Sequence, residues 1–89
     1  MASDRIVVGA TADDVRARTV ARRLRDAGHE IVFVGGDQSP DQLARTAVAE
    51  DARRLVVDAD AASLERVREA CAHFGAADIV VEPVVQHAV

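Results

Sequence analysis

The sequence predicts a single α/β domain built on a parallel sheet, and two observations lead to this fold class. Short β-branched runs alternate with longer segments in which apolar residues recur at helical spacing. The short runs are apolar throughout, which is typical of strands buried on both faces beneath crossover helices. Residues 1–89 are enough for one domain of this kind, and they contain no linker or internal repeat.

Four runs are predicted strands, at residues 5–10, 31–34, 55–57 and 79–81. Pro83 is expected to stop the fourth strand, since proline cannot donate to a strand ladder. Right-handed crossovers leave few topologies for these strands. We expect a flavodoxin-like (Rossmann-like) three-layer sandwich with strand order 2-1-3-4, ending before a fifth strand and its helix, with residues 84–89 as a short apolar tail.

Three amphipathic helices are predicted between the strands. The first should span residues 13–27, with Thr11 as its N-cap, acidic residues in its first turn and Gly28 just past its end. The second should begin at Pro40, with Ser39 as N-cap and Gln42 completing a capping box. The third should follow an Asp60 cap and end at Gly75, with an apolar stripe of Leu64, Val67, Cys71 and Phe74.

Composition excludes several classes of function. The formal net charge of −4 argues against nucleic-acid binding. No apolar run is long enough for a membrane span and no signal peptide is evident, so a cytoplasmic location is expected. The single cysteine, Cys71, excludes an internal disulfide and a multi-cysteine zinc site. All eleven basic residues are arginine, which excludes lysine Schiff-base chemistry and a P-loop lysine.

In an open α/β sheet, ligands bind beyond the carboxyl ends of the strands, here near the switch point between the first and third strands. The first loop has neither Gly-rich phosphate motif. Asp13 and Asp14 could hold a metal or carry acid–base chemistry, but helix capping is the favoured interpretation. Asp58 and Asp60 could join Asp13 in a metal cluster, although a turn and a cap explain them better.

The histidines and the cysteine suggest no catalytic constellation. His29 is expected in a surface turn at the amino edge of the sheet, and His73 near a helix end that favours a cation. His87 falls in the tail and is expected to be mobile. Cys71 lies on the core stripe and is expected to be a small buried apolar residue.

The strongest charge feature is the first helix, which carries Arg16, Arg18, Arg22, Arg23 and Arg25. These arginines could dock an acidic partner or a phosphate-bearing ligand. The favoured interpretation is a solvated outer face, with Asp14–Arg18 and Arg22–Asp26 at a spacing that allows ion pairs.

From residue 5 to about residue 83 the sequence resembles the cobalamin-binding domain of methylmalonyl-CoA mutase and related acyl-CoA mutases. The stretch SPDQLARTAV, residues 39–48, is the most specific segment, and it is a structural helix in that family. The resemblance implies a cobalamin-domain scaffold. If the chain belongs to an enzyme, it implies the cobalamin domain or subunit of an acyl-CoA mutase, which is an isomerase.

The ligand loops depart from the family pattern. The family signature DxHxxG aligns with TADDVR, which puts Asp13 where the cobalt-ligating histidine is expected and Arg16 where the glycine is expected. The loop after the third strand, from Asp58 to Ser63, lacks the family's Ser-x-Leu. Glu82-Pro83 replaces the Gly-Gly turn. We therefore assign no cobalt ligand, and the degenerate loop positions are Thr11, Asp13, Arg16, Asp58 and Ser63.

The expected function is non-catalytic association, as a homodimer or with a larger mutase-type subunit. The side of the fourth strand, with Val84, Val85 and Val89 beside it, is the expected contact because exposed sheet edges tend to be covered. An alternative is a module that still binds cobalamin without histidine ligation. A receiver-like phospho-acceptor at Asp58 is disfavoured by the missing lysine and by the position of the acidic pair.

Overall fold

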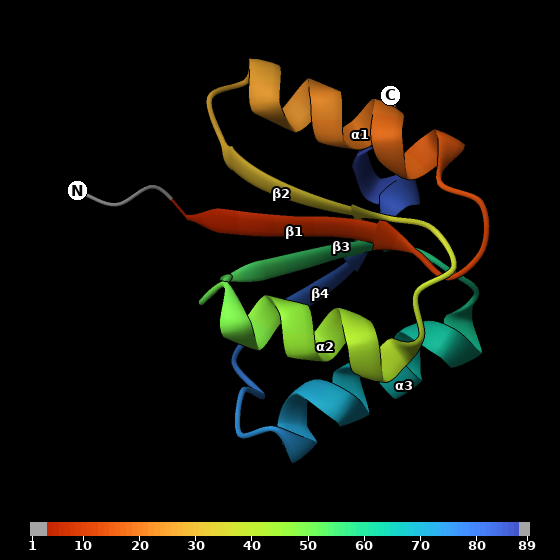
Figure 1. The fold of residues 1–89 in the computed structure, drawn as a ribbon, viewed down its shortest axis with the longest axis vertical. Coiled ribbons are helices and arrows are strands. Elements are labelled where there is room, and N and C mark those ends of the chain that lie inside the picture. Colours follow the sequence, from red (N-terminus) through yellow and green to blue (C-terminus); the bar gives the residue numbers. More distant parts are fainter. Residues whose placement is uncertain (1–3, 88–89) are drawn as a thin grey trace.

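The computed structural model describes residues 4–87 and confirms the predicted fold class. All strand pairs are parallel and the order is β2-β1-β3-β4. Figure 1 shows α1 on one face of the sheet, and α2 and α3 on the other. The elements are β1 (Arg5–Ala10), α1 (Val15–Asp26), β2 (Glu30–Gly35), α2 (Pro40–Ala49), β3 (Arg54–Asp58), α3 (Ala61–His73), β4 (Val80–Pro83) and the 3₁₀ helix η1 (Val84–His87).

The starts of α2 and α3 confirm the predicted caps. The Ser39 hydroxyl accepts a hydrogen bond from the Gln42 backbone N–H at 3.1 Å, and the Gln42 side chain accepts from the Ser39 N–H at 2.8 Å. Asp60 Oδ1 accepts from the Ser63 N–H at 2.7 Å. Each contact spans three residues, so local sequence is enough to specify it.

The predicted start of α1 is wrong. The helix begins at Val15, Asp14 takes the N-cap position without a side-chain cap bond, and Thr11 lies outside the helix. The acidic pair is therefore not in the first turn. The physical reason is that residues 11 and 12 are held by β3 and by the loop after β2: the Thr11 N–H donates to Asp58 O and the Asp37 N–H donates to Ala12 O.

β4 includes Pro83 as its last residue instead of stopping before it. The Val80 N–H donates to Arg53 O, so the alternate residues Val81 and Pro83 direct their backbone groups away from β3. A proline at such a position breaks no ladder hydrogen bond.

Two buried clusters lie on opposite faces of the sheet. One, beneath α2 and α3, contains Leu43, Leu55, Val57, Leu64, Val67 and Cys71. The other, beneath α1, contains Ile6, Val8, Ala17, Val20, Val56 and Val84. Within residues 4–87, no helix is long and apolar enough to span a membrane.

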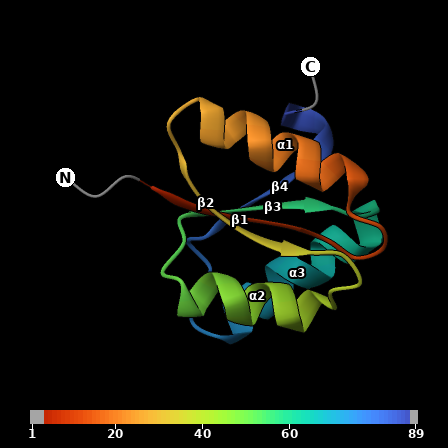
Figure 2. The ribbon, with the colours of Figure 1, turned by 45° about the horizontal axis from the view of Figure 1, so that its top comes forward.

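The tail corrects two expectations. Val84 is only 1% exposed, because η1 turns back against α1 and β3 and buries it in the α1-side cluster. His87 is not a loose tail residue: its ring Nε2 lies 3.2 Å from Glu82 Oε1, and Arg23 donates to its carbonyl at 3.3 Å. Val85 is exposed as expected. Val89 lies outside the described residues. Figure 2 shows η1 beside α1 on the same face.

Candidate functional site

The candidate site is the carboxyl edge of the sheet at the switch point between β1 and β3. Three loops meet there: residues 11–14 before α1, 36–39 before α2 and 59–60 before α3. In Figure 1 this edge is on the right, where the strand arrows end. Three of the degenerate positions from the sequence come together at this edge: Asp58 is contacted by the Arg16 side chain and by the Thr11 backbone.

Arg16 and Asp58 form a two-pronged ion pair across the switch point, which we call the Arg16–Asp58 clamp. Arg16 Nε donates to Asp58 Oδ2 at 3.2 Å, and its Nη2 donates to Oδ1 at 2.7 Å. The hydrogen bond to Asp58, reinforced by the carboxylate's charge, raises the pKa of the Arg16 guanidinium. The Asp58 side chain is 15% exposed and that of Arg16 is 64% exposed, so arginine covers the carboxylate from the solvent side.

Main-chain hydrogen bonds tie the loops of this edge to each other. The Thr11 N–H donates to Asp58 O at 3.2 Å, the Asp37 N–H to Ala12 O at 2.8 Å, and the Gln38 N–H to Ala10 O at 3.1 Å. The approach is so close that a Cβ added to Gly36 would lie 2.3 Å from the Ala12 carbonyl oxygen. The backbone of the first and second loops is therefore in direct contact.

The other predicted site residues satisfy local backbone groups. Asp13 Oδ1 accepts from the Val15 N–H at 3.0 Å. Ser63 serves α3 by donating its N–H to Asp60, and this hydrogen bond lowers the pKa of the Asp60 carboxyl. Among residues 4–87, no three His, Cys, Asp or Glu side chains are grouped to hold a metal ion. Asp13, Asp58 and Asp60 therefore do not form a metal cluster in this structure.

Of the two ion pairs expected within or beside α1, the structure shows one. Arg18 donates to Asp14 Oδ1 at 3.2 Å, as predicted, and its guanidinium lies 5.6 Å from the centroid of the Phe33 ring. The expected Arg22–Asp26 ion pair does not form in the part of the chain that the structure describes. Both side chains are exposed.

The cysteine and the two histidines considered as candidate site residues lie in separate parts of the fold. Cys71 is 1% exposed as predicted, and burial raises the pKa of its thiol. The His73 ring packs edge-on against Phe74 with centroids 5.3 Å apart. The His29 N–H donates to Leu24 O in the turn after α1, as its predicted position requires.

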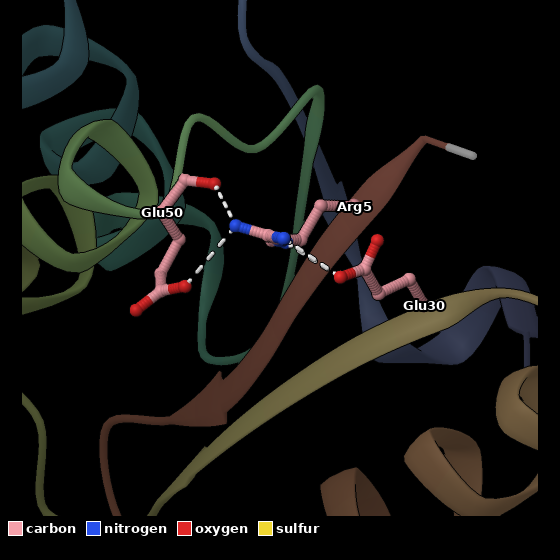
Figure 3. Close-up of polar contacts among 3 residues, drawn as sticks. All are labelled: Arg5, Glu30 and Glu50. Carbon is pink, nitrogen blue, oxygen red and sulfur yellow. Dashed lines mark hydrogen bonds and ion pairs between the residues drawn. The ribbon is translucent and has the colours of Figure 1, made fainter. Parts of the chain in front are cut away.

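Sequence reasoning missed a second arginine network, at the amino edge of the sheet (Figure 3). Arg5 Nε and Nη2 donate to Glu30 Oε1 at 3.1 and 2.7 Å. Its third nitrogen, Nη1, donates to the Glu50 carbonyl oxygen at 2.9 Å and lies 3.4 Å from Glu50 Oε1. The partners are 25 and 45 residues away in sequence, so no local pattern could have predicted them.

Comparison with known proteins gives an informative similarity to an enzyme subunit. No family model matches the chain. The chain is 39% identical over 44 residues to the 2-hydroxyisobutanoyl-CoA mutase small subunit of Aquincola tertiaricarbonis. The matched stretch covers 49% of this chain and 32% of that protein, so the chain spans about a third of the relative's length. Across about half of its length, then, the chain is similar to the small subunit of an acyl-CoA mutase.

Proposed function

We propose that the chain is a non-catalytic association domain of the mutase small-subunit type, with a cobalamin cleft that is closed. The observation that carries the proposal is the Arg16–Asp58 clamp at the switch point. It occupies the place where an α/β sheet of this topology ordinarily receives its ligand. The core beneath it is complete on both faces of the sheet.

The residues at this edge do not fit a histidine-ligated corrinoid. Asp13 stands where the resemblance places the cobalt ligand, and its carboxylate already accepts a hydrogen bond from Val15. Imidazole is the better ligand for a transition metal of this kind, whereas carboxylates suit harder cations. Arg16 stands where the family motif has glycine, and its side chain crosses to β3 instead of leaving space. We therefore assign no step to a bound corrinoid.

The open edge of β4 is protected against the addition of a strand from another chain. Association through backbone strand pairing at this edge is therefore disfavoured. Arg68 donates to the Val81 carbonyl oxygen at 3.1 Å, and Pro83 has no N–H to offer. Side-chain contacts are therefore the proposed mode of association. Two exposed valines support this region as the contact: Val80 is 51% exposed and Val85 is 60% exposed.

The first test is a titration with hydroxocobalamin and adenosylcobalamin, followed by the visible spectrum. At roughly 50 μM ligand we expect no spectral shift and no retention of ligand on gel filtration. Arg16→Ala removes the clamp. Arg25→Ala is the matched control, because it removes an arginine from the same helix and leaves the clamp in place. A spectral shift with the wild-type chain would overturn the closed-cleft proposal. It would favour cobalamin binding without histidine ligation, the candidate supported by the similarity to a mutase small subunit.

The second test addresses association. Light scattering on a sizing column measures the mass of the chain by itself, which tells whether it forms a homodimer. The same measurement on a mixture with the purified large subunit of a 2-hydroxyisobutanoyl-CoA mutase tells whether the two form a complex. We expect one of these assemblies, weakened by Val80→Asp or Val85→Asp. Val48→Asp is the control, because Val48 is an exposed valine on α2, across the sheet. A monomer at roughly 100 μM that ignores the large subunit contradicts the proposal.

A further inference from the structure

The two edges of the sheet differ in their protection. β4 forms one edge, where Arg68 donates to the Val81 carbonyl oxygen and Pro83 has no N–H to offer. β2 forms the other edge, and its residues 31–34 are isoleucine, valine, phenylalanine and valine (Figure 1). These four residues are partly exposed, and none of them is charged. An apolar edge without proline or charge is a site where another strand can add.

The backbone of β2 has unpaired groups along this edge. The Arg5 carbonyl on β1 accepts a hydrogen bond from the segment that leads into β3, so the even-numbered residues of β1 bond to β2. Two of these, Ile6 and Val8, are in register with Ile31 and Phe33. In a parallel ladder a residue bonds to the neighbours of its register partner, so Ile31 and Phe33 direct their own N–H and C=O outward. Among residues 4–87, no side chain forms a hydrogen bond with these outward groups.

The side chains of β2 alternate between the two buried clusters. Ile31 and Phe33 pack against the α1-side cluster, and Val32 and Val34 pack against the cluster beneath α2 and α3. The register of β2 with β1 shifts after Phe33, so the regular ladder ends there. Residues 31–33 are therefore the part of the edge that a further strand can extend, with apolar side chains on both faces.

From this geometry we infer that β2 pairs with β2 of a second copy of the chain, which makes a homodimer with one continuous sheet. A two-fold axis perpendicular to the sheet reverses the strand direction, so the pair is antiparallel and the edge is its own complement. Ile31 of each copy then faces Phe33 of the other and exchanges both main-chain hydrogen bonds with it, while Val32 faces Val32. Pairs of an aromatic and a β-branched side chain stabilise such a contact.

Unpaired charges flank the amino end of this edge on the α1 side. The Arg18 guanidinium lies 5.6 Å from the centroid of the Phe33 ring on β2. Arg22 and Arg25 follow it by four and seven residues, so they lie on the same side of α1, toward its end. Neither they nor the neighbouring Asp26 form an ion pair among residues 4–87. Two arginines and one aspartate leave a net positive charge beside the start of β2.

The carboxyl end of the same edge is acidic. Asp37, in the loop after β2, is exposed and forms no ion pair in the described part of the chain. Two further acidic groups beside β2 are already paired, Asp14 with Arg18 and Glu30 with Arg5. Antiparallel pairing puts the acidic end of each copy beside the basic end of the other. Opposite charges therefore meet twice, which favours a second copy over an unrelated strand.

The charged residues of α2 face α3 and leave the charge at the β2 edge unchanged. The Arg45 guanidinium lies 5.4 Å from the centroid of the Phe74 ring, at the end of α3. Asp41 lines a groove together with Arg66 of α3. The β4 edge of a second copy is a poorer partner for β2, because Arg68 already occupies its outward carbonyl.

The first test is amide hydrogen exchange, measured by NMR on the full chain at roughly 50 μM and roughly 1 mM. The Ile31 and Phe33 amides should exchange at least about threefold more slowly at the higher concentration, because pairing protects them. The Val81 amide, which points outward from β4, should exchange at the same rate in both samples. No slowing at Ile31 and Phe33, or equal slowing at Val81, overturns the inference.

Cross-linking tests the register of the pair. Val32 lies opposite Val32 in a non-hydrogen-bonded pair, which is close enough for a disulfide. Val32→Cys treated with oxidised glutathione should give a covalent dimer on a non-reducing gel, whereas Val80→Cys on β4 should stay monomeric. The native Cys71 does not interfere, because it is 1% exposed. Equal yields from the two variants, or no dimer from Val32→Cys, contradicts the pairing.

Exchange of charge tests the choice of occupant. Asp37→Lys and Arg25→Glu should each weaken the dimer by about fivefold, because like charges then meet, and the two changes together should restore it to within about twofold. Arg45→Glu, on α2, is the control and should change the dissociation constant by less than about twofold. Sedimentation equilibrium measures the constant, and circular dichroism checks that each variant is folded. A double variant no tighter than either single variant, or an equal loss in the control, overturns the inference.

The inference goes beyond the proposed function and concerns a different surface, so the two can fail separately. The contact proposed above, Val80 and Val85, lies beside β4 and stays available to a large subunit when β2 is paired. A homodimer that Val80→Asp dissociates, with no change in exchange at Ile31 and Phe33, would overturn the inference and leave the function in place. Pairing through β2 without binding of the large subunit would leave the inference in place and contradict the mutase-type association.

Discussion

The two ends of the sheet are each closed by one arginine, but the two arginines do different things. At the amino end, Arg5 lies on β1 and reaches Glu30 at the start of β2 and Glu50 at the end of α2 (Figure 3). At the carboxyl end, Arg16 lies on α1 and reaches only Asp58 at the end of β3. Arg5 joins three elements and donates to a backbone carbonyl oxygen. Arg16 joins only two elements, α1 and β3, and does so through the Asp58 side chain alone.

The comparison separates an ion-pair network that stabilises the fold, at the amino end, from an ion pair that lies across the expected ligand site, at the carboxyl end. The Arg5 side chain is 36% exposed and that of Arg16 is 64% exposed, so solvent screens the second more strongly. The amino end is not where an α/β sheet binds ligands, and Arg5 is accounted for by the fold alone. The carboxyl end is where ligands bind, and Arg16 stands across it.

The largest effect should come from the backbone contact that brings the carboxyl-edge loops together. Gly36→Ala places a methyl group against the Ala12 carbonyl oxygen, so the two loops must separate. We expect a loss of about 2–3 kcal/mol in the free energy of unfolding, clearly more than the control below, measured by urea denaturation. Gly28→Ala is the control: it has open space around the added Cβ but a φ of +99°, and should cost about 1 kcal/mol from strain alone. Equal costs would mean that the loop contact is not important for stability.

The next effect compares the two arginines directly. Arg5→Gln should lower the thermal unfolding midpoint more than Arg16→Gln, because it leaves the Glu50 carbonyl and Glu30 without their donor. Differential scanning fluorimetry at neutral pH measures both. If Arg16→Gln proves the more damaging, the clamp is a stabilising element of the fold, and its role as a site closure would have to be reconsidered.

The smallest effect concerns Asp60, which caps α3 at the carboxyl edge. The hydrogen bond from Ser63 lowers the pKa of the folded Asp60 carboxyl below its ordinary value. Its contribution to stability is therefore fully present above the ordinary carboxyl pKa, and it is lost as the pH falls through the lowered value. Asp60→Asn keeps a capping oxygen but cannot titrate there, so its unfolding midpoint should depend less on pH over that acidic range. The same acid dependence in both proteins would show that Asp60 does not contribute it.

Much of the fold could be predicted because its signals are local. The Ser39–Gln42 capping box and the Asp60 cap each lie within three residues, and the helical stripe through Val67 and Cys71 repeats every turn. The strand order followed from short apolar runs and right-handed crossovers. The start of α1 could not be predicted, because it depends on the Asp37–Ala12 hydrogen bond, which connects the loop after β2 to the loop after β1.

The candidate site shows the same division. The sequence alone determined that residues 11–16 read TADDVR, with no histidine in the loop after the first strand and no glycine at position 16, since this requires only residue identities. Only the tertiary structure decided that Arg16 bonds to Asp58, 42 residues away, and that Val84 is buried. The physical reason is that side-chain contacts between distant segments depend on how strands and helices pack, and a local pattern carries no information about that packing.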